Sequence, residues 1–409
     1  MFSWWSRRAK SKEEEEEEEK IFIENGGKLL EQVIKSCGCK YRPFRIFSSG
    51  ELTLAKDAYD LQHHRQCLDF ELNMGIHEER YILLKTCHNS TEGIKQLFEE
   101  AAIALEIRNH KNIMKFLGCC LETKVVLVYE CHSKRRLSNL LHDPKGALSS
   151  ENLYSALSWG SKLRIATEIA DAVTYMHIST STPIIHRDIK SSNIFLDNQN
   201  VTKLFGFDHS LKMPLGDDHV EADVAGTVGY LAPECCIESI FTEMCDVYGF
   251  GVLLLEILTE KMPLYQYYDK EYFEKGHSAS CGQSSFNEDD QELYGLSVDK
   301  LNLSEIKSTS DCSSCFAEVN VDDELHVLAG ETSERDHQSK GEGKKYIRHM
   351  SKKQVIQASL EVNILSEGET KQLMACITLA WQCRKDNPTK RPSMKEVTEE
   401  LRRIKTIKG

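Results

Sequence analysis

Apolar positions along the chain change their period near residue 134. Before this point, Tyr81–Lys85 and Val125–Tyr129 are short apolar runs rich in strand formers, which predicts two strands. Gly93–Ile107 lies between them and has the period of an amphipathic helix. After residue 134 the pattern is mostly helical, as in Trp159–Met176 and Met244–Leu258. The pattern therefore predicts an α+β fold with a small β-rich lobe followed by a large, mainly α-helical lobe.

The segment before the first lobe predicts a helical extension. Leu29 and Val33, and likewise Leu30 and Ile34, are four residues apart, so the pattern predicts one apolar helical face docked on the following lobe. We accordingly divide the chain into residues 1–42 (acidic tail and helical extension), 43–133 (N-lobe) and 134–409 (C-lobe).

Residues 266–350 interrupt the helical pattern of the C-lobe. They are rich in Ser, Asp, Glu, Gly and Lys and show little apolar periodicity. A segment this long without structure of its own inside a compact domain is typical of a disordered insertion. Helical patterning resumes over Glu367–Cys383 and again over Ser393–Ile407.

Charge and cysteine content restrict the class of protein. The 409 residues carry 51 basic and 64 acidic side chains, a formal charge of −13, and seven of the negative charges form the run Glu13–Glu19. The remainder is only mildly acidic, so we expect no nucleic-acid partner. The 15 cysteines follow no regular framework and indicate reduced thiols. Cys312 and Cys315 form a lone CxxC without the second pair that a zinc site requires.

No segment has the pattern of a signal peptide or a membrane span. The most apolar stretch, Val247–Leu258, is too short to span and contains Glu256. The N-terminus lacks an apolar core, and Phe2 excludes N-myristoylation. We expect a cytoplasmic protein. The alternative left open is peripheral contact with the plasma membrane through Trp4-Trp5 and the arginines that follow.

Several motifs, in a fixed order, resemble those of protein kinases. They are Tyr81-Ile-Leu-Leu-Lys85, His110–Glu122, His186-Arg-Asp-Ile-Lys-Ser-Ser-Asn193, Gly226-Thr-Val-Gly-Tyr-Leu-Ala-Pro-Glu234, Asp246-Val-Tyr-Gly-Phe-Gly251 and Lys390-Arg-Pro-Ser-Met-Lys-Glu-Val397. The chain resembles plant receptor-like kinases of the wall-associated type over residues 43–408, apart from the insertion. The resemblance implies a bilobal kinase fold, a buried Glu234–Arg391 ion pair and an Asp246 that binds the catalytic-loop backbone.

Four residues match catalytic positions of the family. The resemblance makes Asp188 the proton acceptor and Lys190 its phosphate-facing neighbour, and it assigns Lys85 to ATP and Asn193 to the second magnesium ion. Phosphoryl transfer requires such groups together, because magnesium and Lys neutralise the charge on the transferred group while the Asp positions the hydroxyl.

The glycine-rich phosphate loop is missing. Residues 59–75 place His63, His64 and Arg65 near the expected turn. The one glycine in this stretch, Gly75, comes well after that turn. Several glycines would be needed for backbone N–H groups to approach phosphates closely. The sequence therefore predicts a degenerate ATP site.

The helix residue that should pair with Lys85 is displaced. Counting back nine residues from His110, the family spacing, gives Ala101. Glu100 is adjacent, but one residue on a helix turns a side chain by about 100°. We expect no carboxylate at this position, with a one-residue register shift to Glu100 as the alternative.

The principal magnesium ligand is absent by spacing. The family places it 18 residues after the proton acceptor, and that position is Gly206. The spacing gives Gly206-Phe207-Asp208 in place of Asp-Phe-Gly, whereas matching by eye gives Leu204-Phe205-Gly206. Phe207 then keeps the packing role of the family aromatic. Asp208 is a metal ligand only if it swings in, which the octahedral geometry of magnesium opposes.

The activation segment offers few phosphorylation sites. Residues 211–226 contain no Ser, Thr or Tyr, although Ser210 and Thr227 flank them. Arg–phosphate pairing, which orders this segment in many active kinases, has no acceptor inside it.

These losses favour a pseudokinase, a kinase-shaped signalling scaffold that requires no cofactor. Glu24–Ile34 and Pro43–Leu52 are similar to the cytoplasmic ZRK-type pseudokinases. That resemblance implies an adaptor in plant immunity and defence, with an NLR immune receptor and receptor-like cytoplasmic kinases as partners. Two alternatives remain: a weakly active Ser/Thr kinase that uses Asp188, Asn193 and a displaced Asp208 or Glu100, and an ATP-binding switch without phosphotransfer.

Overall fold

The computed structural model describes residues 12–37, 43–57, 65–66, 70–87, 90–122, 124–131, 133, 135–142, 157–263 and 350–408. The predicted insertion at 266–350 lies outside the described residues except for Met350. Cys312, Cys315, His63 and His64 also lie outside them.

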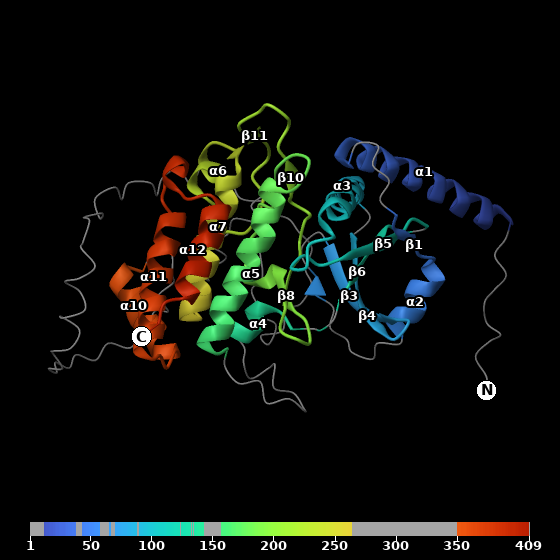
Figure 1. The fold of residues 1–409 in the computed structure, drawn as a ribbon. Coiled ribbons are helices and arrows are strands. Elements are labelled where there is room, and N and C mark those ends of the chain that lie inside the picture. The colour runs from blue at the N-terminus through green and yellow to red at the C-terminus, as the bar shows by residue number, and fades with distance from the viewer. Residues whose placement is uncertain are drawn as a thin grey trace, which may run out of the picture.

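The N-lobe contains a mixed six-stranded sheet in the order β1-β5-β6-β4-β3-β2 (Figure 1). Strand β1 runs parallel to β5, and the other neighbours are antiparallel. The predicted strand Tyr81–Lys85 lies in β4, and Val125–Tyr129 overlaps β6, so both strand predictions are confirmed. The strands are β1 Arg45–Ile46, β2 Arg65–Gln66, β3 Phe70–His77, β4 Arg80–Cys87, β5 Phe116–Cys120 and β6 Val126–Glu130.

Three helices flank this sheet: α1 (Lys12–Cys37), α2 (Ser49–Asp57) and α3 (Thr91–Ile107). Helix α1 packs along α3, as Figure 1 shows. The predicted docked face of α1 is half correct. Leu29 is buried and Val33 packs against the core, but Leu30 and Ile34 are 58% and 50% exposed. Adjacent helix positions are about 100° apart, so the two pairs cannot both face α3.

The C-lobe is mainly helical, with short strand pairs around the loops of the site (Figure 1). Helices α10, α11 and α12 each begin with a serine whose hydroxyl caps the first turn and a Gln or Glu side chain that bonds back, which fixes their starts. The helices are α4 Leu137–His142, α5 Trp159–Ile178, α6 Pro233–Ile237, α7 Glu243–Thr259, α10 Lys352–Val362, α11 Glu367–Cys383 and α12 Met394–Lys405.

The short strands of the C-lobe pair as β7 with β10, β8 with β9, and β11 with β12. Their bounds are β7 Ile184–Ile185, β8 Ile194–Leu196, β9 Thr202–Leu204, β10 Leu211–Lys212, β11 Val220–Glu221 and β12 Ile240–Phe241. Within the part of the chain that the structure describes, no helix combines the length and apolarity needed to cross a bilayer.

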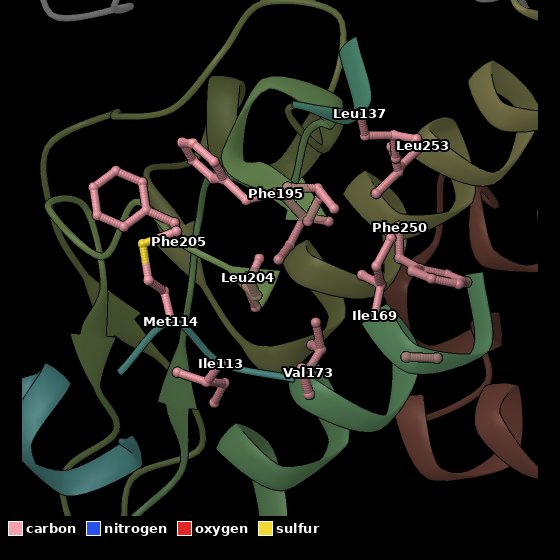
Figure 2. Packing of buried hydrophobic residues seen from close by; sticks show 14 of the residues in the cluster. Ile113, Met114, Leu137, Ile169, Val173, Phe195, Leu204, Phe205, Phe250 and Leu253 are labelled. Carbon is pink, nitrogen blue, oxygen red and sulfur yellow. The ribbon is translucent and has the colours of Figure 1, made fainter. Parts of the chain in front are cut away.

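One hydrophobic core extends through both lobes beneath the loops of the site (Figure 2). The backbone N–H of Met114 donates to the carbonyl of Leu204 at 2.9 Å, which joins the connection after α3 to β9. The ring of Phe205 packs edge-on against Phe195, with centroids 5.7 Å apart. The loops that carry the candidate site therefore rest on a packed apolar base.

Candidate nucleotide and phosphotransfer site

The loop from His186 to Asn193 is fixed from below by α7. The Asp246 carboxylate, buried, accepts from the backbone N–H of His186 at 2.7 Å and of Arg187 at 2.8 Å. Each carboxylate oxygen therefore satisfies one buried backbone donor. This is the contact that the kinase resemblance implies for Asp246, and it holds Asp188 in a defined position.

Asp188 lies at the centre of a dense polar network. Its carboxylate accepts from the Thr227 hydroxyl at 2.6 Å and from Asn193 Nδ2 at 2.8 Å, and it pairs with Lys190 Nζ at 2.7 Å. Burial works to raise the pKa of Asp188, but Lys190, His209 and these hydrogen bonds outweigh it and lower that pKa. The structure thus brings Asp188, Lys190 and Asn193 together, with Asp188 ionised.

Lys85 is held by two carboxylates. Its ammonium lies 2.8 Å from Glu100 Oε2 on α3 and 2.7 Å from Asp208 Oδ1, and its side chain is 3% exposed. The two acids outweigh the effect of burial and raise the pKa of Lys85. Lys85 is therefore a buried cation whose charge is already neutralised by protein.

The expectation that no helix carboxylate reaches Lys85 is wrong. Glu100 occupies this position and also accepts from the Tyr129 hydroxyl at 2.7 Å. Ala101, which the spacing selected, is buried elsewhere in the core. The count from His110 assumed a connection of fixed length after α3, and one residue of difference turns the helix by about 100°. Burial raises the pKa of Glu100, which Lys85 opposes.

An aromatic ring from the first residue of β3 covers the Lys85 ammonium. Phe70 begins β3, and its ring centroid is 4.4 Å from Lys85 Nζ, within cation–π range. Leu72 pairs directly with Lys85, so Phe70, two residues away, projects from the same face of the sheet. Strand β3 therefore brings a bulky side chain next to the ammonium that the resemblance assigns to ATP.

Gly75 serves a different purpose from that of a phosphate loop. It lies within β3 opposite Ile82, and a Cβ there would be 3.2 Å from the backbone of Ala55 in α2. The glycine lets α2 approach the strand closely.

Gly206 occupies the position expected from the 18-residue spacing. Its φ is +85°, and a Cβ there would lie 2.7 Å from Asn193 Cγ. Leu204, the alternative from matching by eye, is buried in β9, and its backbone is paired with Asn112 and Met114. Position 206 therefore faces Asn193, and it carries no side chain.

The Phe207 side chain is buried against the catalytic loop. Its ring packs edge-on to His186, with centroids 5.3 Å apart. Phe205 packs instead against Tyr129 and Phe195. Both aromatic positions are therefore used as core, and the shape of the site is kept.

Each oxygen of the Asp208 carboxylate contacts a nitrogen-bearing side chain. Lys85 contacts Oδ1, and His209 Nε2 is 3.4 Å from Oδ2. Although burial opposes it, the charge of Lys85 lowers the pKa of Asp208, so the group is ionised. The sequence placed a carboxylate here but gave no indication that it reaches Lys85 across the two lobes.

The donor set fits magnesium poorly. Magnesium prefers about six oxygens in octahedral geometry. Position 206 offers no side-chain oxygen, Asp208 pairs with Lys85 and contacts His209, and Asn193 Nδ2 is turned toward Asp188. These side chains therefore do not complete a magnesium coordination shell. The kinase resemblance implies ATP and magnesium as ligands, but these side chains supply no dedicated metal cage.

The activation segment is held by backbone acceptors. Arg187 donates to the carbonyl oxygens of His209, at 3.2 Å, and Asp223, and its guanidinium lies 3.9 Å from the Phe241 ring centroid. The flanking hydroxyls are used internally: Ser210 donates to the His186 carbonyl, and Thr227 to Asp188. This segment is ordered without a phosphate.

A buried ion pair joins the end of the activation segment to the C-terminal part of the C-lobe. Arg391 donates to both oxygens of Glu234, at 2.5 and 2.8 Å, as the kinase resemblance implies.

Comparison with known proteins agrees with this architecture. The chain belongs to the protein kinase domain family, whose model matches residues 77–401.

The particular relatives are wall-associated receptor kinases of Arabidopsis thaliana. The chain is 39% identical over 253 residues to wall-associated receptor kinase-like 6, covering 59% of this chain and 38% of that protein. It is 30% identical over 413 residues to wall-associated receptor kinase-like 1, covering 98% and 45%. It is 29% identical over 398 residues to wall-associated receptor kinase 2, covering 95% and 44%. The chain therefore spans less than half the length of these relatives.

Proposed function

We propose that this chain is a pseudokinase: a kinase-fold protein impaired in phosphoryl transfer that acts by binding other signalling proteins. The observation that carries this proposal is the state of Lys85, held between Glu100 and Asp208 and covered by Phe70. ATP phosphates would have to displace a buried carboxylate to reach this ammonium. The side chain that usually fixes the metal is absent at Gly206.

These deficits act together. In phosphoryl transfer the metal, the Lys and the proton acceptor stabilise one transition state, so the loss of any one of them already removes most of the catalysis. The intact Asp188, Lys190 and Asn193 network supports the shape of the loop, because its donors and acceptors bond to one another.

One observation favours a second candidate, a weakly active Ser/Thr kinase. Asp208 does project into the site, since its carboxylate reaches Lys85. If ATP and magnesium drew Asp208 away from Lys85, the chain would regain one metal ligand. An ATP-binding switch without transfer needs the same displacement.

The deciding assay is magnesium-dependent transfer of labelled phosphate from ATP by the purified chain, to itself and to a generic basic substrate. We expect no signal above that of Asp188→Asn. Transfer that is lost in both Asp188→Asn and Asp208→Asn would establish the weakly active kinase. Tight ATP binding by calorimetry, with no transfer, would establish the switch.

The adaptor role is proposed from the plant relatives and from the resemblance to ZRK-type pseudokinases. On this proposal the partners are an NLR immune receptor and receptor-like cytoplasmic kinases, inside the plant cell. We expect co-purification with an NLR protein from plant tissue, equally with Asp188→Asn. A complex that forms only with ATP and is lost with Asp188→Asn would contradict an adaptor independent of the active site.

A further inference from the structure

Two cysteine sulfurs meet outside the catalytic loop. Cys235 lies in α6, at the end of the activation segment, and Cys245 lies in the first turn of α7. Their Sγ atoms are 2.6 Å apart. A disulfide bond is about 2.05 Å long and tolerates little misplacement of the backbone, so the two side chains already converge as a bond requires.

The surroundings of this pair are confined. Cys235 is 0% and Cys245 7% exposed. A cavity of about 10 Å³, lined by both cysteines together with Arg187, Phe241 and Asp246, adjoins them. That volume corresponds to about one water molecule. Small reagents therefore have room beside the sulfurs, whereas large ones do not.

A metal ion is a poorer occupant than a bond between the sulfurs. Glu234 lies close enough to complete a three-residue ligand set with the two cysteines. However, both oxygens of Glu234 are taken by Arg391. Only two sulfurs remain, and structural zinc uses four ligands.

We propose that Cys235 and Cys245 form a reversible disulfide under oxidation by a small peroxide. The more exposed Cys245 thiolate attacks a peroxide oxygen, forming S–O as O–O breaks and water or an alcohol leaves. Cys235, as it loses its proton, then attacks the Cys245 sulfur, forming S–S as S–O breaks and water leaves. Two thiols lose two electrons and two protons, and one peroxide is reduced. A dithiol reductant reverses the bond by exchange.

The bond would join α6 to α7 next to two structural anchors. Glu234 precedes Cys235 and binds Arg391, while Asp246 follows Cys245 and binds the catalytic loop. The cross-link therefore ties the end of the activation segment to the helix that holds His186 and Arg187. The hydrogen bond to Cys245 and burial raise the pKa of Cys235, so little of this thiol is ionised and the second step is slow.

The test uses the full chain, reduced, desalted and exposed to hydrogen peroxide, then quenched in acid and alkylated. Trypsin cannot resolve the pair, because Lys212 and Lys261 are the nearest cleavage sites. Cleavage after glutamate separates residues 235–238 from 244–256. We expect mass spectrometry to find these two peptides joined through Cys245, and separate again after dithiothreitol.

Cys236 gives the matched control, because it neighbours Cys235 in the same peptide. In Cys236→Ser the joined peptide should form within twofold of the wild-type rate, and in Cys235→Ser it should be lost. If Cys235→Ser fails to fold, wild type and Cys236→Ser still decide the question. A link that disappears in Cys236→Ser, or Cys235 and Cys245 both recovered alkylated after peroxide, would overturn the proposal.

Discussion

Replacing Lys85 by Met tests whether this side chain is a structural cation. The substitution keeps a long, unbranched side chain and removes the charge. It leaves the buried Glu100 and the partly buried Asp208 without their shared partner. Glu100 keeps the Tyr129 hydroxyl, and Asp208 keeps His209.

The magnitude follows from the distances. At 2.7–2.8 Å each carboxylate attracts the ammonium by about 6 kcal/mol at an effective dielectric constant of ~20. Much of this attraction offsets the cost of burying the charges. Removing one member of a buried ion pair typically costs about 3–5 kcal/mol in the free energy of unfolding. Since two acids lose their partner, we expect a loss in the upper half of that range.

The assay is urea unfolding of the purified chain followed by circular dichroism, with Lys115→Met as control. Lys115 is an exposed lysine of the same lobe and should cost less than about 0.5 kcal/mol. Adding Asp208→Asn to Lys85→Met removes one of the two orphaned acids and should recover part of the loss.

The pH dependence has a definite sign. Lys85 works to lower the pKa of both acids, so without it the pKa of Asp208 rises and that of Glu100 rises further, and the folded variant binds more protons than the wild type. The deficit of Lys85→Met should then shrink as pH falls from 8 to 5, by at most about 1.4 kcal/mol per pH unit for each proton. A cost below about 1 kcal/mol, unchanged across this range, would refute the reasoning.

Three further substitutions test other contacts by the same unfolding measurement. Gly206→Ala should cost about 1–3 kcal/mol, because it places a Cβ at positive φ against Asn193, and an unchanged stability would contradict the assigned conformation. Lys212→Met should cost about 1–3 kcal/mol by leaving the buried Glu106 without its cation, and a loss equal to that of an exposed lysine would count against this. Glu234→Gln should cost about 3–5 kcal/mol, since it leaves a buried arginine without its counter-charge; less than 1 kcal/mol would exclude a structural pair.

Long periodic elements were predictable from the sequence because local patterns determine them. Glu367–Cys383 agrees residue for residue with α11, and Gly93–Ile107 differs from α3 only at its start. The 18-residue spacing from Asp188 selected position 206, and in the structure Gly206 lies against Asn193.

The contacts of Lys85 were not predictable in the same way. The count from His110 missed Glu100 by one position, because it assumed a fixed length for the connection after α3. An error of one residue changes the direction of a helical side chain by about 100°. Asp208 reaches Lys85 from the C-lobe, so this contact depends on how the lobes pack, whereas the contact of Phe70 depends on the register of β3 against β4. The exposure of Leu30 likewise depends on which side of α1 meets α3.

The contact between Arg187 and the Asp223 carbonyl has a consequence for how the activation segment can be controlled. A phosphate on a side chain is added by a kinase and removed by a phosphatase, so the order that it produces can be switched on and off. A main-chain carbonyl is present from translation onward and survives substitution of the residue that bears it. The contact that orders this segment therefore needs no phosphate, and no phosphatase can reverse it.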